Sequence, residues 1–362
     1  MFRPMELPLI PRIRAAVARP IARTVFETRW LRAWAAASRS EPVEGRTLDP
    51  RLAAMLRLDD MDNRSDLRRY TPARARLVVA EGIAVVQAPC MAPVLVEPVE
   101  LAGPAGAVPA RRYTPEGLPA PSPAVLYVHG GGFVTGDMDT HDPLCRLIAS
   151  RAKLRVISVD YRLAPEHRFP AALDDAVAAF RDVVRRADAL GVDATRIAVS
   201  GDSAGGNLSA ALGMRTRADT VRPALLVPVY PALDATCSQP SFGTLGARYF
   251  LTREMCDWYY EHYLGSDPGA RRDPEASPLL AADLAGLPPA LVYTSGFDPL
   301  RDEGRAYADR LRAADVPVRH HCFDDLLHGF LLMTAVSESA RSATFRVIDE
   351  MAQALRDGAL PA

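Results

Sequence analysis

The residues around Ser203 have the types and spacing of a serine nucleophile. A β-branched run at 197–199 leads into GDSAG (201–205), and a helix-compatible stretch follows. A hydroxyl attacks a carbonyl only if its oxygen is held clear of its own strand and near a base. A sharp strand-to-helix turn does this, and the two glycines let the strand and the helix pack tightly around the serine. Alone, this short pattern is equally compatible with an ordinary surface turn.

A second glycine-rich motif lies upstream, where the apolar run 124–128 leads into HGGGF (129–133). Acyl transfer places negative charge on the former carbonyl oxygen, and backbone N–H groups aimed at that point stabilise the charge. Successive glycines after a strand allow the backbone bend that turns such N–H groups toward one cavity. The two motifs together, in this order, predict nucleophilic acyl transfer at Ser203.

With these motifs the chain resembles the hormone-sensitive-lipase-like esterases, the HGGG-bearing branch of the α/β-hydrolases with GDSAG around the nucleophile. Further stretches carry the resemblance: DYRLAPEHRFPAALDD (160–175), SPLLAADLAGLPPALVYTSGFDPLRDEG (277–304) and HGF (328–330). The resemblance runs from about Leu48 to near the C-terminus. It implies a serine carboxylesterase that acts on short- to medium-chain acyl esters through an acyl-enzyme and needs no cofactor.

Four histidines follow Ser203 in the chain, and α/β-hydrolases place the catalytic histidine last. His262 lies in an aromatic helical stretch and is expected to be a surface or packing residue. His320 and His321 lie in a strand-like run, where alternation points one inward and one outward. His328 follows that run in a loop, and its HGF context matches the family's catalytic histidine. His328 is therefore the predicted base.

Five carboxylates near the ends of the last two strand-like runs are candidates for the acid: Asp298, Asp302, Glu303, Asp324 and Asp325. Asp298 comes first after the run 290–294, and Pro299 fixes the chain directly behind it. Asp302 and Glu303 open the next helix, where the helix dipole by itself favours negative charge. The family's acid aligns with Asp298, which completes the predicted triad.

The resemblance also implies the groups that surround the reacting carbonyl. The predicted oxyanion donors are the backbone N–H groups of Gly131, Gly132 and Ala204. The predicted substrate contacts are Phe133, beside the oxyanion glycines, and the cap residues Trp258 and Tyr259. His129 is expected to brace the glycine loop, and Asp202 to fix the loop rather than act as a second acid.

The order of strand-like and helix-like segments predicts the α/β class. A hairpin is expected from Val94–Leu101 and Val108–Tyr113, followed by strands near 124–128, 155–160, 197–200, 224–229, 290–294 and 318–323. Helical patterns lie between most of them, including Ala171–Leu190 and Asp302–Ala314. Apolar strands alternating with helices predict a mostly parallel central sheet flanked by helices, with function at the carboxyl ends of the strands. The resemblance specifies this as the α/β-hydrolase fold with a helical cap.

Segments without this rhythm suggest the domain boundaries. The resemblance implies that residues 46–93 and 234–282 form the cap, and that residues 94–233 and 283–362 form the catalytic domain. Residues 1–45 are a basic extension, with eight arginines and two glutamates in residues 1–40. An arginine-rich helix with interfacial tryptophans suits peripheral contact with anionic lipid. Because the apolar stripe is interrupted at Pro20, packing of this extension over the cap is the favoured interpretation.

Composition restricts the remaining function classes. With 362 residues, 49% of them hydrophobic, the chain can bury a large core, and a net charge of −1 gives no reason to expect nucleic acid. Five widely spaced cysteines, no apolar run that could span a membrane and no secretory signal suggest a cytoplasmic enzyme. A homodimer is compatible with the resemblance, but no residue specifies one.

Two polar clusters have simpler interpretations than a ligand site. Residues 137–142 (DMDTHD) carry potential metal ligands, but a helix start capped by Thr140 or Asp142 explains them, so no metal is predicted. Residues 161–166 (YRLAPE) are expected to hold their loop through an Arg–Glu brace rather than to recognise substrate charge.

Three rival functions remain open at this level. The same triad can serve an amidase, peptidase or deacetylase. A long-chain lipase would require a more apolar lid than the mixed 234–282 segment. A non-catalytic binding protein on this fold is disfavoured because Ser203, Asp298 and His328 are all present.

Overall fold

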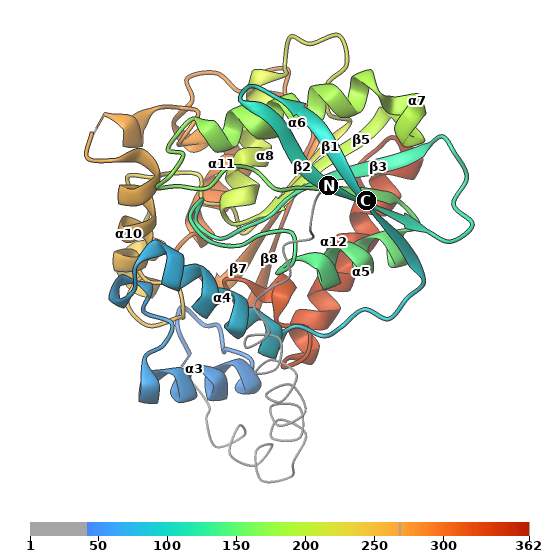
Figure 1. Ribbon diagram of the computed structural model, residues 1–362. Helices are drawn as coiled ribbons and strands as arrows, with labels where there is room; N and C mark the ends of the chain where they lie inside the picture. The colour runs from blue at the N-terminus through green and yellow to red at the C-terminus, as the bar shows by residue number, and fades with distance from the viewer. Residues whose placement is uncertain (1–41, 268, 362) are drawn as a thin grey trace.

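The computed structural model describes residues 42–267 and 269–361, and its centre is one eight-stranded sheet (Figure 1). The strand order is β1-β2-β4-β3-β5-β6-β7-β8. The strands are β1 Val94–Gly103, β2 Gly106–Pro115, β3 Ser122–Val128, β4 Arg155–Val159, β5 Val192–Asp202, β6 Leu225–Val229, β7 Ala290–Phe297 and β8 Val318–Leu327. The basic extension lies almost wholly outside the described residues, and the interpretations of its role stay predictions.

The predicted hairpin and parallel strands are all present. β1 and β2 pair antiparallel, β2 joins β4 antiparallel, and every pair from β4 to β8 is parallel. All residues of β4, β6 and β7 are buried, as expected for strands covered on both faces. The carboxyl ends of β3, β5, β7 and β8 therefore meet at one edge of the sheet, where the predicted site residues follow them.

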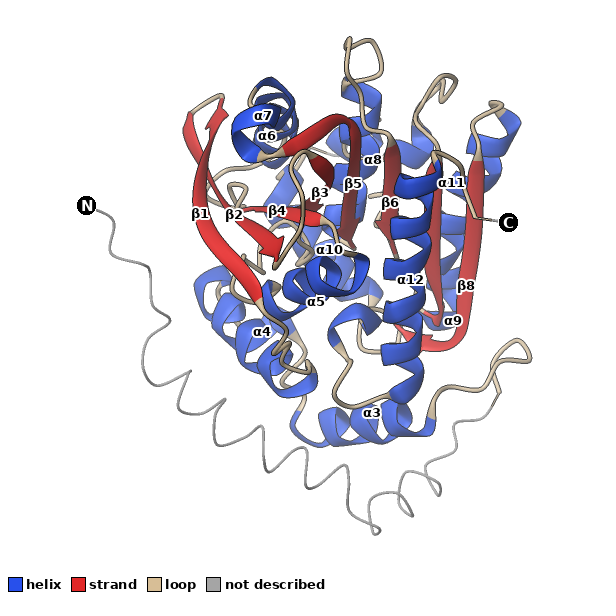
Figure 2. Ribbon diagram, turned by 90° about the vertical axis from the view of Figure 1, so that its right-hand side faces the viewer, coloured by secondary structure: helices blue, strands red, loops and turns tan. Residues whose placement is uncertain are grey.

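Helices cover both faces of the sheet (Figure 2). One face carries α6 Ala171–Arg185, α8 Ala204–Arg215 and α11 Arg301–Ala313, and the other carries α5 Asp142–Ala152 and α12 Glu338–Asp357. The buried apolar residues accordingly form two clusters, one on each face. The predicted helix over 171–190 is broken at Arg186 into α6 and the short α7 Ala187–Leu190, which ends at the left-handed Gly191.

The two segments assigned to a cap are helical. The first contains α3 Pro50–Asp62, η1 Leu67–Arg69 and α4 Pro72–Val86, and the second contains α9 Ser241–Leu245, α10 Arg253–Leu264, η2 Ala270–Arg272 and η3 Pro278–Leu280. The remaining short helix, η4 Phe330–Leu332, follows β8. In Figure 1 α3, α4 and α10 lie together beside one end of the sheet, and η1 contacts α10.

Side-chain caps and prolines explain where the cap helices begin. Asp49 accepts hydrogen bonds from the N–H groups of Arg51 and Leu52, with Pro50 in the first turn of α3. Thr252 caps α10 in the same way. At α5 the expected side-chain cap was wrong, because His141 occupies the cap position and forms no capping bond.

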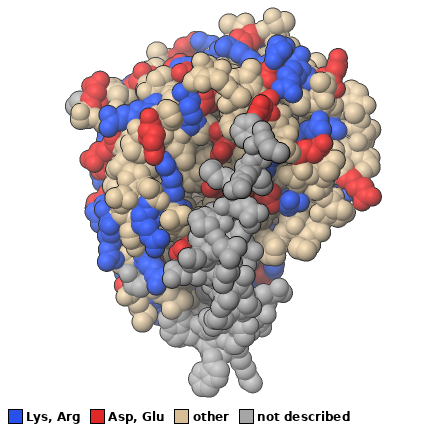
Figure 3. Space-filling model, viewed as in Figure 1, with Lys and Arg blue, Asp and Glu red and all other residues tan. Residues whose placement is uncertain are grey.

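Among the described residues, no helix combines the length and the apolar character that a membrane span requires. Acidic and basic side chains are interspersed on the face shown in Figure 3. Arginines form ion pairs with nearby carboxylates, as between Arg151 and Asp349 or between Arg181 and Asp219.

Candidate active site

Ser203, Asp298 and His328 lie together at the carboxyl ends of β5, β7 and β8. Nε2 of His328 is 2.9 Å from Oγ of Ser203, and Nδ1 of His328 is 2.8 Å from Oδ2 of Asp298. These distances form a continuous hydrogen-bonded chain from the carboxylate through the imidazole to the hydroxyl. Each of the three predicted residues thus occupies the position that its predicted role requires.

The turn at Ser203 has the strained geometry of a nucleophile elbow. Ser203 has φ 55° and ψ −117°, a combination that a residue with a side chain adopts only when its surroundings impose it. Its N–H donates to the carbonyl of Val229 at the end of β6. A Cβ at Gly205 would overlap the carbonyl oxygen of Val128, so glycine there is what lets α8 approach β3. The glycine two residues after Ser203 in the GDSAG motif is thus required by the close contact between the backbones of α8 and β3.

The carboxylate of Asp298 is fully buried and held from its own loop. Its Oδ1 accepts from the N–H of Leu300 at 2.8 Å, which leaves Oδ2 for His328. Two of the alternative acids have other partners. Asp302 pairs with Arg301 at 3.0 Å. Glu303 accepts hydrogen bonds from the backbone N–H groups of Leu233 and Asp234 in the loop after β6. Burial raises the pKa of Glu303 well above its ordinary value.

The alternative histidines also have their own partners. Nδ1 of His262 lies 2.8 Å from the carbonyl of Trp258, one turn back in α10. His320 contacts Thr294 and His321 contacts Arg346, so alternation does turn the two rings to opposite faces of the sheet. Both residues are half-buried on the edge strand β8.

The glycine loop after β3 is bent as its sequence predicted. Gly131 and Gly132 have φ values of 122° and 60°, which favour glycine. The carbonyl of Gly131 accepts from the N–H groups of Val134 and Thr135 and from the Thr135 hydroxyl, which closes the loop. No described residue accepts a hydrogen bond from the N–H groups of Gly131, Gly132 or Ala204. These three donors are therefore available to a bound oxyanion.

His129 and Asp202 hold the glycine loop, as expected. Nδ1 of His129 lies 2.8 Å from the carbonyl of Gly130, and its ring stacks on Tyr161 with centroids 4.3 Å apart. Burial, followed by the charge of His141, lowers the pKa of His129 to about 4. Oδ1 of Asp202 accepts from the N–H of Gly130 at 2.9 Å. Neither side chain reaches the chain of bonds between Asp298 and Ser203.

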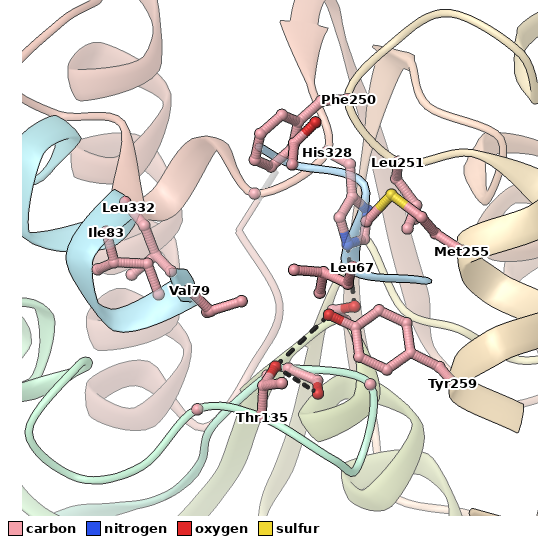
Figure 4. A pocket seen from close by; sticks show the side chains of 18 of the residues that line it. Leu67, Val79, Ile83, Thr135, Phe250, Leu251, Met255, Tyr259, His328 and Leu332 are labelled. Atoms are coloured by element: carbon pink, nitrogen blue, oxygen red, sulfur yellow. Dashed lines mark hydrogen bonds between the residues drawn. The ribbon is translucent and has the colours of Figure 1, made fainter. Parts of the chain in front are cut away.

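A cavity of about 920 Å³ opens in front of Ser203 and His328. Val79 and Ile83 of α4 and Leu332 of η4 face Met255 and Tyr259 of α10 across it (Figure 4). The lining is predominantly aliphatic and aromatic, as is usual for sites that bind apolar small molecules. The site therefore lies between the sheet edge and both predicted cap segments.

Of the three predicted substrate contacts, two line the cavity and one does not. Phe133 and Tyr259 are lining residues, and Phe133 is fixed by stacking on Tyr263 with centroids 3.8 Å apart. Trp258 was predicted wrongly. The lining face of α10 consists of Met255, Cys256, Tyr259 and Tyr260. Trp258 falls on the next face of the helix, where it packs against His262.

The helix α4 forms a wall of the cavity whose residues were not predicted from the sequence. Val78, Val79, Ile83 and Val86 were not identified, although an apolar helix before the first strand was the available signal. Arg76 of the same helix donates to the carbonyls of Val134 and Ala164 and pairs with Glu166. These contacts of Arg76 connect α4 to the glycine loop and to the segment 164–166.

The two polar clusters are structural, with partners that differ from those expected. Arg162 forms a bidentate pair with Asp175, and Glu166 pairs with Arg76, so the brace within 161–166 was wrong in its partners. In the 137–142 cluster, Asp139 pairs with Arg111 and the Asp137 carboxylate accepts from the N–H of Thr140. No group of residues with metal-binding geometry occurs in the described parts of the chain.

Comparison with known proteins identifies the family. A family model described as alpha/beta hydrolase fold matches residues 125–332. The carboxylic ester hydrolase LipN of Mycobacterium tuberculosis is 41% identical over 326 residues, which cover 87% of this chain and 85% of that protein. The ethyl acetate hydrolase of Pseudomonas putida is 42% identical over 64% of this chain and 73% of its own length.

Solved structures agree with this assignment. An esterase from Pyrobaculum calidifontis superposes with a TM-score of 0.77 at 35% identity, covering 87% of this chain and all of that one. An alpha/beta hydrolase from the metagenome of Lake Arreo gives a TM-score of 0.80 at 39% identity, covering 84% of this chain and 98% of that one. The chain therefore belongs to the α/β-hydrolase family, in its hormone-sensitive-lipase-like branch of carboxylic ester hydrolases.

Proposed function

We propose that this enzyme hydrolyses short- to medium-chain carboxylic esters through an acyl-enzyme on Ser203, with His328 as base and Asp298 as the acid. The observation that carries the mechanism is the hydrogen-bonded chain from Asp298 through His328 to Ser203. The related proteins named carboxylic ester hydrolase and ethyl acetate hydrolase support the substrate class.

Each step follows from this geometry. Oγ of Ser203 attacks the ester carbonyl while Nε2 of His328 takes its proton, and the buried Asp298 stabilises the imidazolium and fixes its tautomer. The free N–H groups of Gly131, Gly132 and Ala204 stabilise the oxyanion. His328 then gives the proton to the leaving alcohol. A water molecule, activated by the same histidine, releases the acid and regenerates the serine.

Residues 46–93 and 234–282 act as the cap that selects the substrate, because they supply both apolar walls of the cavity. We assign the enzyme to the cytoplasm, a location supported by its five free cysteines, since the cytosol keeps thiols reduced. A homodimer and contact of residues 1–40 with anionic lipid are both compatible with this function, and both are alternatives that the sequence left open.

The test combines labelling with a substrate series. An organophosphate should modify Ser203 alone, and Ser203→Ala should lower ester turnover on the order of 10⁴-fold or more without loss of folding. Activity on p-nitrophenyl esters should be highest at acyl chains of about two to eight carbons, as the resemblance implies, and should exceed that on the matching anilide. Labelling at Ser200 or Ser209, peak activity on palmitate, or preference for the anilide would contradict the proposal.

A further inference from the structure

A buried ion pair that the triad does not use lies behind the glycine loop. Nε2 of His141 is 3.3 Å from Oδ1 of Asp202, and the two side chains are 1% and 4% exposed. His141 begins α5, whereas Asp202 ends β5 directly before Ser203. The pair therefore joins two elements that are far apart in sequence at the back of the site.

The surroundings of His141 favour protons on both ring nitrogens. Nδ1 lies 3.3 Å from the backbone carbonyl of Asp137, which can only accept, and 3.0 Å from the Thr140 hydroxyl. That hydroxyl donates its own proton to the same carbonyl, so it too can accept from the ring. Nε2 faces the Asp202 carboxylate, where a lone pair would be repelled. Acceptors near both nitrogens therefore favour the imidazolium form of the ring.

The other groups around the pair are neutral or acidic. His129 at the end of β3 is neutral near pH 7, because burial and the charge of His141 depress its pKa to about 4. Tyr127 of β3 donates its hydroxyl proton to Asp202 at 2.8 Å, and Tyr230, after β6, is a buried phenol. Buried Cys145 and the half-exposed Asp142 come from α5, and Asp137 from the preceding loop. Among the described residues, His141 makes the largest cationic contribution at Asp202.

The directions of the two pKa shifts agree with this geometry. Burial alone would lower the pKa of His141, but the Asp202 carboxylate outweighs it and raises that pKa above the ordinary value. Burial alone would raise the pKa of Asp202, but the His141 cation and the hydrogen bonds hold it below its ordinary value. The charged form of each residue is therefore favoured by the other.

Asp202 contacts both halves of the oxyanion site. Its carboxylate accepts from the N–H of Gly130, directly before Gly131, and its own backbone leads into Ser203 and Ala204. A Cβ at Gly130 would overlap Oδ2 of Asp202, so the loop lies directly against this carboxylate. A negative charge here, if unpaired, would oppose the negative charge that develops on the substrate oxygen.

We infer that His141 is a positioning residue that neutralises Asp202, so that Asp202 can hold the glycine loop against the nucleophile elbow without repelling the tetrahedral intermediate. The inference rests on the proposed ester hydrolysis. Asp202 supplies the geometry because it binds Gly130, and His141 supplies the compensating charge. Removing one partner of a buried pair leaves the other charge uncompensated, which is more harmful than replacing both.

A double-mutant cycle on turnover tests this. His141→Gln, Asp202→Asn and the double variant are compared in kcat and KM for one soluble ester, with active sites counted by organophosphate titration. His141→Gln should lower kcat on the order of 10- to 100-fold with little change in KM, because the repulsion acts only in the transition state. Adding Asp202→Asn should recover about tenfold or more of that loss. A double variant no faster than His141→Gln would overturn the inference.

The pH profile gives a second readout that a merely structural role would not alter. Because the folded-state pKa of His141 is raised, its charge is present at low pH and is lost as pH rises through that value. The wild-type kcat should fall on this alkaline limb, and Asp202→Asn should remove the limb. If His141→Gln fails to fold, Asp202→Asn alone decides, since persistence of the limb contradicts the inference. A wild-type chain that cleaves no ester would instead contradict the proposed function.

Discussion

The layer behind the nucleophile and the walls in front of it are built differently. Behind Ser203 the last six residues of β5 and the whole of β6 are buried, and a single added carbon at Gly205 would collide with the backbone of β3. In front, only Ala75 of the fifteen residues of α4 is fully buried, and the Cβ position of Gly82 contacts nothing within 4 Å. The first region is closely packed around the reacting groups, whereas the second leaves space for added side-chain atoms.

This difference separates chemistry from selectivity. Proton transfer and oxyanion stabilisation need fixed distances, which close packing and buried hydrogen bonds supply. Selection among apolar esters needs only a wall of the right size, which a half-buried helix supplies. Substitutions behind Ser203 should therefore impair turnover or folding, whereas substitutions in α4 should mainly change substrate preference.

The largest effect is expected at the acid. Asp298→Asn should lower kcat by roughly 10⁴-fold, because the amide favours the wrong tautomer of His328 while the fold is preserved. Steady-state kinetics on titrated enzyme measures this. Asp302→Asn is the matched control one turn further on, and it should stay within about threefold. The assignment fails if the two variants lose activity equally.

Packing behind the elbow should be next in size. Gly205→Ala places a methyl group against the carbonyl of Val128 and should destabilise folding by about 3 kcal/mol or more, as measured by urea denaturation. Gly243→Ala in α9, where a Cβ meets nothing within 4 Å, should change stability by less than about 1 kcal/mol. If the two substitutions lowered the free energy of unfolding equally, close packing behind Ser203 would not explain the effect of Gly205→Ala.

A half-buried carboxylate after β4, that of Asp160, gives a pH-dependent effect. Burial, and secondarily Asp137, raises the pKa of Asp160 to about 6. Its ionisation therefore opposes folding, and the associated stability is present below the unfolded-state pKa and lost as pH rises through about 6. Asp160→Asn should raise the free energy of unfolding by about 1–3 kcal/mol at pH 8, with the gain vanishing near pH 4. Denaturation at both pH values measures this, and an equal gain at both would contradict it.

The anchor of α4 should affect binding more than chemistry. Arg76→Met removes the bonds to Val134, Ala164 and Glu166 and should raise KM by roughly three- to tenfold with a smaller change in kcat. Arg151→Met is the matched control, since it breaks a bidentate pair with Asp349 away from the cavity and should leave KM unaffected. If Arg76→Met instead lowered kcat at constant KM, α4 would act on the chemical step, which would contradict this prediction.

The smallest effect is expected at Gly82, inside α4. Gly82→Ala should stabilise the chain by about 0.5–1 kcal/mol, because glycine in a helix interior is disfavoured and the added methyl group meets open space. Gly82 lines the cavity, so the added methyl group should narrow it and turnover of the longest accepted esters should fall relative to that of acetate. Thermal unfolding and the p-nitrophenyl ester series measure the two changes, and a loss of stability would show that this wall is closely packed.

The sequence by itself determined the fold class and the three residues of the hydrogen-bonded chain. The alternation of apolar strands with helices specified a parallel sheet. Ser203 was assigned from its own motif, and Asp298 and His328 from their positions after strands together with the family resemblance. Such assignments succeed because glycine spacing, strand ends and turn chemistry are local properties of the chain. The bends at Gly131 and Gly132 were predictable for the same reason.

Only the tertiary structure decided which side chains meet across elements. Arg162 pairs with Asp175 rather than within its own loop, Trp258 faces away from the cavity, and α4 forms a cavity wall. The pair of His141 and Asp202 likewise joins residues 61 positions apart. Contacts of this kind depend on the rotation and spacing of elements that fold against one another, and no local pattern in the sequence encodes them.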